Sequence, residues 1–379
     1  MRRFMPLFLL AACSAGGEAA QSNSEAAGQA KGGRPFAVRP VATFNEPWAM
    51  AFLPGPGPRA LVTERSGRLK LLWNDTGRVG DVAGAPAVDY GGQGGLGDVV
   101  LHPRFAQNRL VYLSWVEAGE GKTRGAVVGR ARFLEGSGGP RLEGLQVIWR
   151  QSPKLSGKGH YGHRIAFGPD GKLYISNGDR QEFTPAQDMS GNLGKIVRLN
   201  DDGTVPADNP FAKRGGVTAQ IWSLGHRNPL GIAFDGSGRL WDIEMGPKGG
   251  DELNLVERGR NYGYPIVSNG DHYDGRDIPD HRTRPEFEAP KVSWTPVISP
   301  GDMIFYSGKA FSGWRGDILV AGLSSKALIR VDVNGNTARE AERWDMGQRI
   351  REVEQGPDGS VYLLEDGKGG RLLRLTPTR

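Results

Sequence analysis

The chain has 379 residues, of which 58 are glycine, 25 are proline and 38% are hydrophobic, with 48 lysines and arginines against 42 aspartates and glutamates. This hydrophobic share supports a large core and excludes a disordered chain, while the glycines and prolines predict many loops. The net charge of +6 is spread along the whole sequence, which excludes the concentrated basic surface of a nucleic-acid-binding protein. No apolar run beyond residue 12 reaches the roughly 18 residues that a membrane-spanning helix needs.

The first residues predict an export signal followed by an anchor. A basic pair at 2–3 precedes a short apolar stretch, and the Leu-Ala-Ala-Cys sequence at its end resembles a bacterial lipobox. Cys13 is the only cysteine of the chain, so it forms no internal disulfide, and acylation would give it a role. We predict a signal peptide over 1–12 and a flexible tether over 13–35 with a lipidated Cys13, in an exported, periplasmic protein held at the outer membrane. Ordinary secretion with cleavage at a nearby small residue is the alternative.

The rest of the chain repeats one pattern, a turn rich in Gly, Pro or Asp that leads into a short apolar strand. Six copies occur, three of them clear (166–175, 233–241 and 355–363) and three looser (51–69, 101–113 and 310–320). Alternating apolar residues on both sides of such a turn are the signature of consecutive antiparallel strands. A strand-only repeat of about 40 to 50 residues or more predicts an all-β fold, a six-bladed β-propeller of four-stranded antiparallel blades, in one domain over 36–379.

A histidine in the middle of the chain is the first candidate for chemistry. His160 lies in a loop bracketed by Gly159 and Gly162, where a core role is awkward. Histidine is the side chain whose ordinary pKa lies near neutrality, which suits a general base. A zinc site shared with His163 is disfavoured, because no cysteine, helix or third ligand stands at a recognisable spacing. A solvated loop histidine is the alternative.

Three further segments carry polar residues at predicted strand ends. In a propeller, the strand nearest the axis delivers its terminal residues to the mouth of the central channel, which makes His226–Asn228, placed before a proline that ends the strand, a candidate site. The segment 244–252 offers bare carbonyls and carboxylates, the oxygen ligands that calcium prefers. Arg349 and Arg351 alternate onto one strand face and repel each other unless an anion sits between them; a solvated strand face is the alternative.

Together these segments resemble the soluble pyrroloquinoline quinone (PQQ)-dependent glucose/sorbosone dehydrogenase family, and most closely its aldose sugar dehydrogenase branch. The resemblance covers about residues 38–375. The motifs that carry it are Gly225–Pro229, Asn261–Pro265 and the Gln-bearing loop Gly92–Leu96.

The resemblance implies a role for individual residues. His160 is the general base and Asp179 orients it. The residues implied in cofactor binding are Gln93, Arg227, Asn228, Arg349 and Arg351. A family lysine that contacts the cofactor falls at or near Ser324, and Lys326 would replace it because the same strand face recurs every second residue. The carbonyls of Gly246 and Pro247 would hold a calcium ion at the cofactor, and Glu252 with the carbonyl of Tyr262 would hold a structural calcium. Gly159 stands where relatives often carry an acidic or polar residue.

The implied reaction is oxidation of the C1 hydroxyl of aldose sugars to lactones, with hydride passing to C5 of PQQ and electrons then passing to a separate acceptor, a cytochrome or a quinone. Arginine suits the three carboxylates of PQQ through its bidentate donors, and calcium polarises the quinone carbonyl. Two other functions stay open, because propellers host all three: a calcium-dependent lactonase and a non-catalytic binding module. The Arg349 and Arg351 pair favours an anionic cofactor over hydrolysis.

Overall fold

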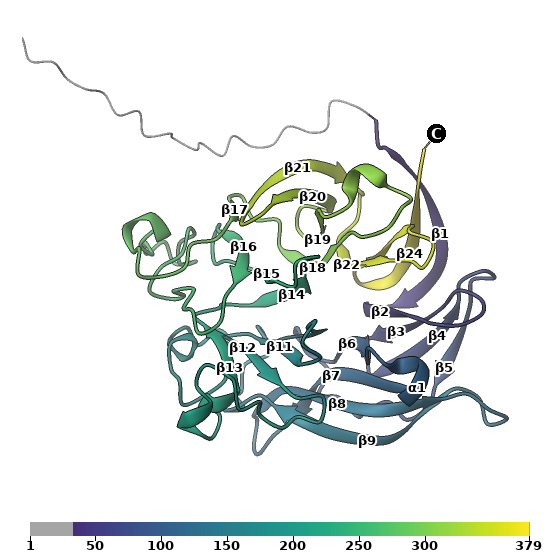
Figure 1. Cartoon of the computed structure of the whole chain (residues 1–379), viewed down its shortest axis with the longest axis horizontal. Coiled ribbons are helices and arrows are strands. Elements are labelled where there is room, and N and C mark those ends of the chain that lie inside the picture. The colour runs from purple at the N-terminus through teal and green to yellow at the C-terminus, as the bar shows by residue number, and fades with distance from the viewer. Residues whose placement is uncertain (1–32, 379) are drawn as a thin grey trace, which may run out of the picture.

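Six four-stranded antiparallel sheets surround a central axis in the computed structural model, which describes residues 33–378 (Figure 1). The predicted six-bladed propeller is confirmed. The predicted signal peptide, Cys13 and most of the tether lie outside the described residues. Among residues 33–378, no helix has both the length and the apolar character needed to cross a membrane.

Five blades follow the order of the chain. The first two contain β2 (Pro47–Leu53), β3 (Arg59–Glu64), β4 (Arg68–Trp73) and β5 (Arg78–Val82), then β6 (Leu96–Leu101), β7 (Leu110–Ala118), β8 (Arg124–Leu134) and β9 (Arg141–Arg150). The third and fourth contain β10 (Gly162–Phe167), β11 (Leu173–Asn177), β12 (Lys195–Leu199) and β13 (Ile221–Leu224), then β14 (Pro229–Phe234), β15 (Leu240–Glu244), β16 (Asp251–Val256) and β17 (Val292–Trp294). The fifth contains β18 (Pro300–Phe305), β19 (Ile318–Gly322), β20 (Ala327–Asn334) and β21 (Thr337–Asp345). Helix is limited to α1 (Phe105–Asn108) and five short 3-10 turns in the described part of the chain: η1 (Thr184–Ala186), η2 (Ala212–Arg214), η3 (Thr218–Gln220), η4 (His281–Thr283) and η5 (Ser312–Trp314).

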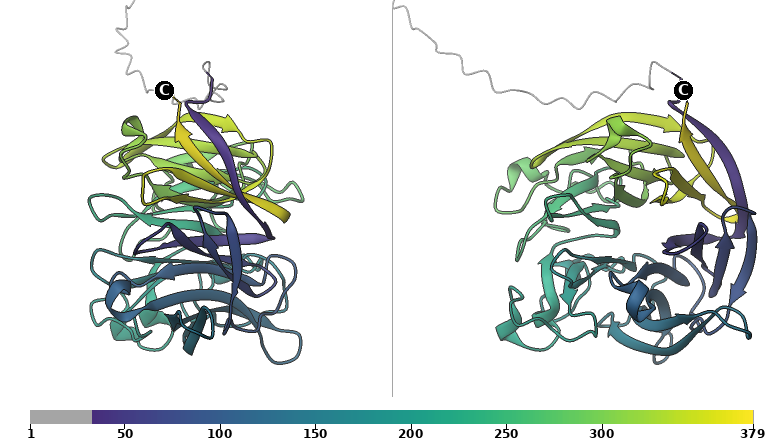
Figure 2. Two further views of the ribbon diagram at one scale, coloured as in Figure 1. Left: turned by 90° about the vertical axis from the view of Figure 1, so that its right-hand side faces the viewer. Right: turned by 45° about the vertical axis from the view of Figure 1, so that its right-hand side comes forward.

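The sixth blade joins the two ends of the chain. It consists of β22 (Ile350–Gln355), β23 (Val361–Glu365), β24 (Lys368–Pro377) and, as its outermost strand, β1 (Phe36–Asn45). The purple β1 runs alongside the yellow β24 in both views of Figure 2, and the two strands pair antiparallel from Phe36 with Pro377 to Asn45 with Lys368. Because the first strand completes the last blade, the ring opens only if this ladder breaks.

All six sequence repeats fall on the connection between the first and second strands of a blade. In the three clear copies, an aspartate closes the turn: Oδ1 of Asp170, Asp235 and Asp358 accepts a hydrogen bond from the backbone N–H two residues later. Such Asx turns explain why Asp and Gly recur there. The repeat is thus the hairpin that joins the innermost strand of each blade to the next strand outward.

The first strands of successive blades contact one another in a closed ring, and a single arginine ties that ring together. Arg164 of β10 is buried and donates to Glu352 of β22 at 2.7 Å, to the carbonyl of Leu230 in β14 at 2.8 Å and to that of Gly301 in β18 at 2.6 Å. Its guanidinium lies 4.0 Å from the ring centroid of Trp48 in β2 and 3.5 Å from Asp98 in β6. One side chain therefore contacts the inner strand of each of the other blades.

Candidate active site at one end of the propeller

The candidate residues gather at one end of the ring for a topological reason. Within a blade the first and second strands run antiparallel, so the start of the first strand and the end of the second lie at the same end. A cavity of about 260 Å³ opens there, close to the lower end of the range of roughly 300–1,000 Å³ for small-molecule sites. Every blade contributes to its wall, through Trp48, Arg65, Gln93, Tyr161, His163, Leu230, Met245, Leu323, Arg349, Arg351 and Asp366.

His160 and Asp179 form a buried pair beside this cavity. Nδ1 of His160 lies 2.7 Å from Oδ1 of Asp179, and the aspartate is fully buried. The loop that carries His160 is held against the wall of the cavity, because Gln93 accepts a hydrogen bond from the His160 backbone N–H at 2.7 Å. The structure therefore brings together His160, Asp179 and Gln93, the residues predicted as base, orienting carboxylate and cofactor ligand.

The environment of His160 favours the neutral imidazole. Burial lowers the pKa of His160, and the guanidiniums of Arg227 and Arg180 act in the same direction against the carboxylate of Asp179, which raises it. With Nδ1 donating to Asp179, the lone pair resides on Nε2, which no group in residues 33–378 hydrogen bonds. A neutral imidazole with a free Nε2 can accept a proton.

The position before His160 has no side chain, and a neighbouring amide fills its place. A Cβ atom built on Gly159 would lie 2.4 Å from Oε1 of Gln181. Gln181 is fixed in turn, since its backbone N–H donates to Oδ1 of Asp179 at 2.9 Å. The side-chain amide of Gln181, from the loop that carries Asp179, therefore lies beside the backbone just before His160.

His163 lies close to His160 in sequence, but its side chain contacts other residues. It stacks on Trp48 with ring centroids 5.0 Å apart, and its Nδ1 lies 2.7 Å from the hydroxyl of Ser114. Burial lowers the pKa of His163 to about 3, so the imidazole is neutral. Its stacked, neutral ring forms part of the cavity wall.

The anion between the two predicted cationic side chains is a carboxylate of the chain itself. Arg349 donates from Nε to Asp366 at 2.8 Å, and Arg351 donates to the other oxygen of Asp366 at 3.1 Å. Burial raises the pKa of the Asp366 carboxyl, but the two guanidiniums outweigh this effect and lower it. All three side chains line the cavity. Two guanidiniums against one carboxylate give this group a net positive charge. The alternative of a merely solvated strand face is therefore wrong for Arg351, which is largely buried.

The segment of Arg227 and Asn228 lies at the start of an inner strand, because Pro229 is the first residue of β14. The prediction that this proline ends a strand is therefore wrong. Nη1 of Arg227 donates to the carbonyl of Met245 at 2.8 Å and to that of Gly246 at 2.5 Å. Asn228 is fully buried, and its Oδ1 accepts from the backbone N–H of Gly162 at 3.2 Å. In this structure Arg227 therefore stabilises the predicted calcium loop through hydrogen bonds, and Asn228 stabilises the loop that carries His160 in the same way.

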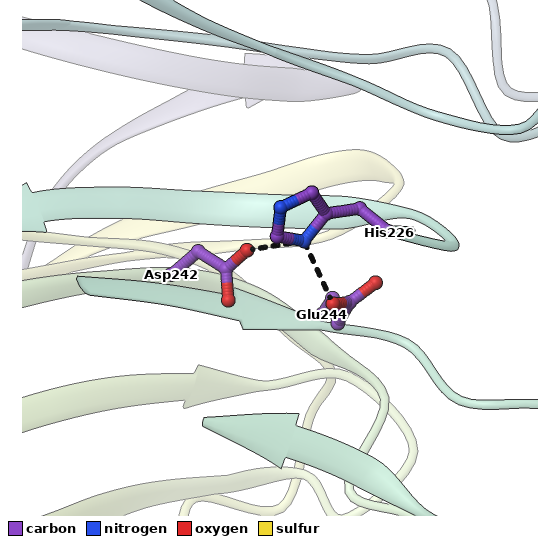
Figure 3. Close-up of side chains that lie close together, drawn as sticks. All are labelled: His226, Asp242 and Glu244. Carbon is purple, nitrogen blue, oxygen red and sulfur yellow. Dashed lines mark hydrogen bonds and ion pairs between the residues drawn. The ribbon is translucent and has the colours of Figure 1, made fainter. Parts of the chain in front are cut away.

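A buried ionic cluster holds this turn in place (Figure 3). Nδ1 of His226 lies 3.0 Å from Oδ2 of Asp242 and 3.1 Å from Oε1 of Glu244, two side chains on the same face of β15. Burial lowers the pKa of His226, but the two carboxylates outweigh it and raise it to about 9. Glu244 also accepts the backbone N–H of Arg227 at 2.5 Å. The three groups are close enough to surround a metal ion, but a protonated His226 already supplies the positive charge the carboxylates need.

The predicted calcium ligands lie together in part. Gly246, Pro247 and Glu252 line one small cavity of about 10 Å³, close to the volume one water-sized sphere needs. Glu252 is buried, and its Oε1 lies 3.2 Å from Nε2 of His281. Burial raises the pKa of Glu252, so a cation nearby would stabilise its charged form. Carbonyl and carboxylate oxygens around an ion-sized space fit calcium.

Two predicted residues lie apart from these cavities. Tyr262 is not among the residues that line the small cavity; its side chain stacks on His226 with ring centroids 4.8 Å apart. Lys326 is exposed and lies outside the wall of the large cavity. The premise for Lys326 is wrong, because residues 323–326 form the turn between β19 and β20 and do not continue a strand face.

Three residues of the site were missed from the sequence. Asp366 pairs with both arginines of the cavity wall, Gln181 fills the space beside Gly159, and Arg180 is buried next to Asp179. Arg180 and Gln181 directly follow the predicted Asp179, and that proximity was the available signal. No feature of the sequence pointed to Asp366, because only the pairing of β22 with β23 brings its carboxylate to the two arginines.

Comparison with known proteins gives one consistent family. The family model described as glucose/sorbosone dehydrogenase matches residues 44–374. The aldose sugar dehydrogenase YliI of Escherichia coli K12 is 40% identical over 339 residues, which cover 88% of this chain and 91% of that protein. The apo-form crystal structure of the soluble aldose sugar dehydrogenase from Escherichia coli matches with a TM-score of 0.84 at 39% identity, over 90% of this chain and 100% of that one. The PQQ-bound aldose sugar dehydrogenase of Streptomyces coelicolor matches with a TM-score of 0.74 at 29% identity, over 90% and 98% of the two chains.

Proposed function

The chain belongs to the glucose/sorbosone dehydrogenase family, and we propose that it is a PQQ- and calcium-dependent aldose sugar dehydrogenase. The observation that carries this proposal is the buried His160 and Asp179 pair, with a free Nε2, beside a cavity whose wall holds Arg349 and Arg351. Two relatives support it, an aldose sugar dehydrogenase that is 40% identical and a PQQ-bound aldose sugar dehydrogenase that is 29% identical.

The residues of the large cavity fit an anionic cofactor. Arg349 and Arg351 present guanidinium groups with one carboxylate between them, and Arg65 and Gln93 add further donors to the wall. Arginine binds carboxylates through two parallel N–H donors, which suits the three carboxylates of PQQ. PQQ, when bound, supplies an electrophilic quinone carbon that accepts the hydride from C1 of the sugar.

His160 takes the proton in this reaction. The C1 hydroxyl of the sugar gives its proton to Nε2 of His160 as the C–H bond breaks, which leaves a carbonyl at C1 and an imidazolium. Asp179 stabilises that imidazolium through Nδ1, and it fixes the tautomer beforehand. The arrangement follows the general design in which a buried carboxylate orients a histidine base.

Calcium has a candidate place beside this site. The carbonyls of Gly246 and Pro247, together with the carboxylate of Glu252, would hold it, and a bound calcium would supply a Lewis acid for a substrate or cofactor oxygen. Arg227 now donates to the Gly246 carbonyl and would share it with the ion or release it. We further propose that Cys13 anchors an exported enzyme to the membrane and that electrons leave to a separate cytochrome or quinone.

Dye-linked sugar oxidation by the purified apoprotein tests the proposal. We expect turnover of an aldose only when PQQ and calcium are added together, with the sugar lactone as product. Hydrolysis of added lactones without PQQ would support the alternative of a calcium-dependent lactonase. Absence of turnover in both assays would support the alternative of a binding module.

A further inference from the structure

Two contacting segments next to the base carry unusual backbone conformations. His160 has a φ of 48°, and in the loop after Asp179 the φ angles of Arg180, Gln181 and Phe183 are 60°, 65° and 61°. Positive φ is uncommon for residues other than glycine and is a strained backbone conformation for them. Such backbone conformations persist only where hydrogen bonds and packing from neighbouring residues stabilise them.

Arg180 makes those contacts. Its side chain is fully buried; Nε donates to the carbonyl of Gly159 at 2.9 Å, and Nη2 donates to that of Gly157. Nη1 donates to the carbonyl of Arg124 at 2.8 Å and to Oε1 of Gln151 at 3.0 Å. The guanidinium also lies 4.0 Å from the ring centroid of Tyr161. One side chain thus occupies the space beneath the loop that carries His160.

The peptide groups on both sides of His160 are held by this residue. The peptide that joins Gly159 to His160 accepts from Nε of Arg180 through its carbonyl and donates to Gln93 through its N–H. The peptide after His160 accepts at its carbonyl from the backbone N–H of Arg180, at 3.3 Å. Because Arg180 directly follows Asp179, a shift of its side chain would move the base and its orienting carboxylate together.

The charge of Arg180 also has no carboxylate partner within 4.0 Å among residues 33–378, although buried charges are normally paired. Its acceptors are neutral carbonyl groups, and burial lowers the pKa of Arg180. A carboxylate here would have satisfied the guanidinium equally well but would have favoured a protonated His160. The unpaired cation opposes that protonation instead.

We propose that Arg180 is a positioning residue that fixes the peptides on both sides of His160. Its buried cation also acts against protonation of the His160 imidazole. This inference rests on the role of His160 as base in the proposed function. The charged groups that face His160 are Asp179, which favours its protonated form, and Arg227 and Arg180, which oppose it. Loss of Arg180 removes one of the two opposing cations.

The test measures the titration of His160 in the apoprotein by NMR, with the His160 signal assigned by comparison with His160→Gln. In Arg180→Met we expect the His160 pKa to rise, kcat for sugar oxidation to fall at least tenfold with KM changed less, and the acid limb of the kcat profile to move to higher pH. Arg180→Lys keeps the charge but has fewer donors, so its His160 pKa should stay close to that of the parent while kcat falls to an intermediate value.

Arg198→Met is the matched control. Arg198 is a buried arginine of the same blade, but it pairs with Asp170 and Asp208, so its loss should lower stability and leave the His160 titration unchanged. The proposal is overturned if Arg180→Met leaves both the His160 titration and kcat unchanged, or if Arg198→Met changes them as much. If Arg180→Met fails to fold, Arg180→Lys decides: parental kcat overturns the proposal, and a lowered kcat with an unchanged titration supports it. If the parent oxidises no sugar, the proposed function fails, while the titration still tests how Arg180 acts on His160.

Discussion

Arg351 lies 3.1 Å from Asp366, so a carboxylate of the chain occupies the position between two cationic side chains of the cavity wall. An anionic cofactor that binds there has to share the N–H donors of Arg349 and Arg351 with this aspartate. The pair is thus aligned before binding, because Asp366 holds both guanidiniums in one orientation.

Replacement of the buried member of this pair should weaken cofactor binding. Arg351→Met removes a charge-assisted contact from a largely buried position, so we expect PQQ affinity to fall by about 1.5–3 kcal/mol. Excess PQQ should restore much of the rate. Fluorescence titration of the apoprotein measures the affinity, and Arg339→Met, which removes an exposed pair on an outer strand, is the control. Parental affinity in Arg351→Met would exclude this residue from the cofactor site.

Loss of the base should separate chemistry from binding. His160→Ala should bind PQQ and calcium almost normally yet lose roughly 10²- to 10⁴-fold in the reductive half-reaction, the range usual for a general base. Asp179→Asn should be intermediate, since the imidazole remains but its tautomer loses support. Stopped-flow absorbance with sugar deuterated at C1 should show a primary isotope effect in the parent. A parental rate of PQQ reduction in His160→Ala contradicts the assignment.

Calcium should stabilise the protein through Glu252. An ion that binds only the folded chain raises its melting temperature, and the Gly246, Pro247 and Glu252 oxygens supply the predicted ligands. We expect Glu252→Gln to lose most of the calcium-dependent rise seen by calorimetry. Glu257→Gln, an exposed carboxylate beyond the end of β16, is the control and should keep it. An equal rise in both variants would place the ion elsewhere.

Acid sensitivity should depend on His163. Burial lowers its folded-state pKa to about 3, whereas the unfolded chain takes up the proton near the ordinary value of about 6.5. Stability from this residue is therefore fully present above pH 6.5 and is lost as the pH falls toward 3, because the unfolded state binds more protons. We expect His163→Gln to flatten the decline in free energy of unfolding between these values, as measured by urea titration. A decline as steep as that of the parent would contradict the buried, neutral assignment.

The anchor predicted from the sequence is tested by Cys13→Ala. If Cys13 is acylated, the variant should move from the membrane to the soluble fraction while its sugar oxidation stays unchanged, because the tether is remote from the site. Unchanged membrane association, or a mature N-terminus other than Cys13, would favour ordinary secretion or another means of attachment.

Sequence pattern determined the architecture of this protein, because a propeller is built from local hairpins. Each repeat is a turn closed by neighbouring residues, as the Asx turn of Asp170 shows, so its period is visible along the chain. The pairing of His160 with Asp179, 19 residues apart, was implied by the family resemblance, and the two residues stand before β10 and after β11 of one blade. The residues Arg349 and Arg351 were predicted to face an anion for a local reason, the repulsion between side chains two positions apart.

The tertiary structure alone decided which groups complete the site. Asp366 reaches the two arginines only because β22 pairs with β23, and Gln181 fills the space beside Gly159 only because two loops meet above the inner strands. Lys326 shows the reverse error: a period of two was extended through residues that fold as a turn. Side-chain direction follows the sequence within a strand, but at the loops that form this site it follows the packing of one blade against the next.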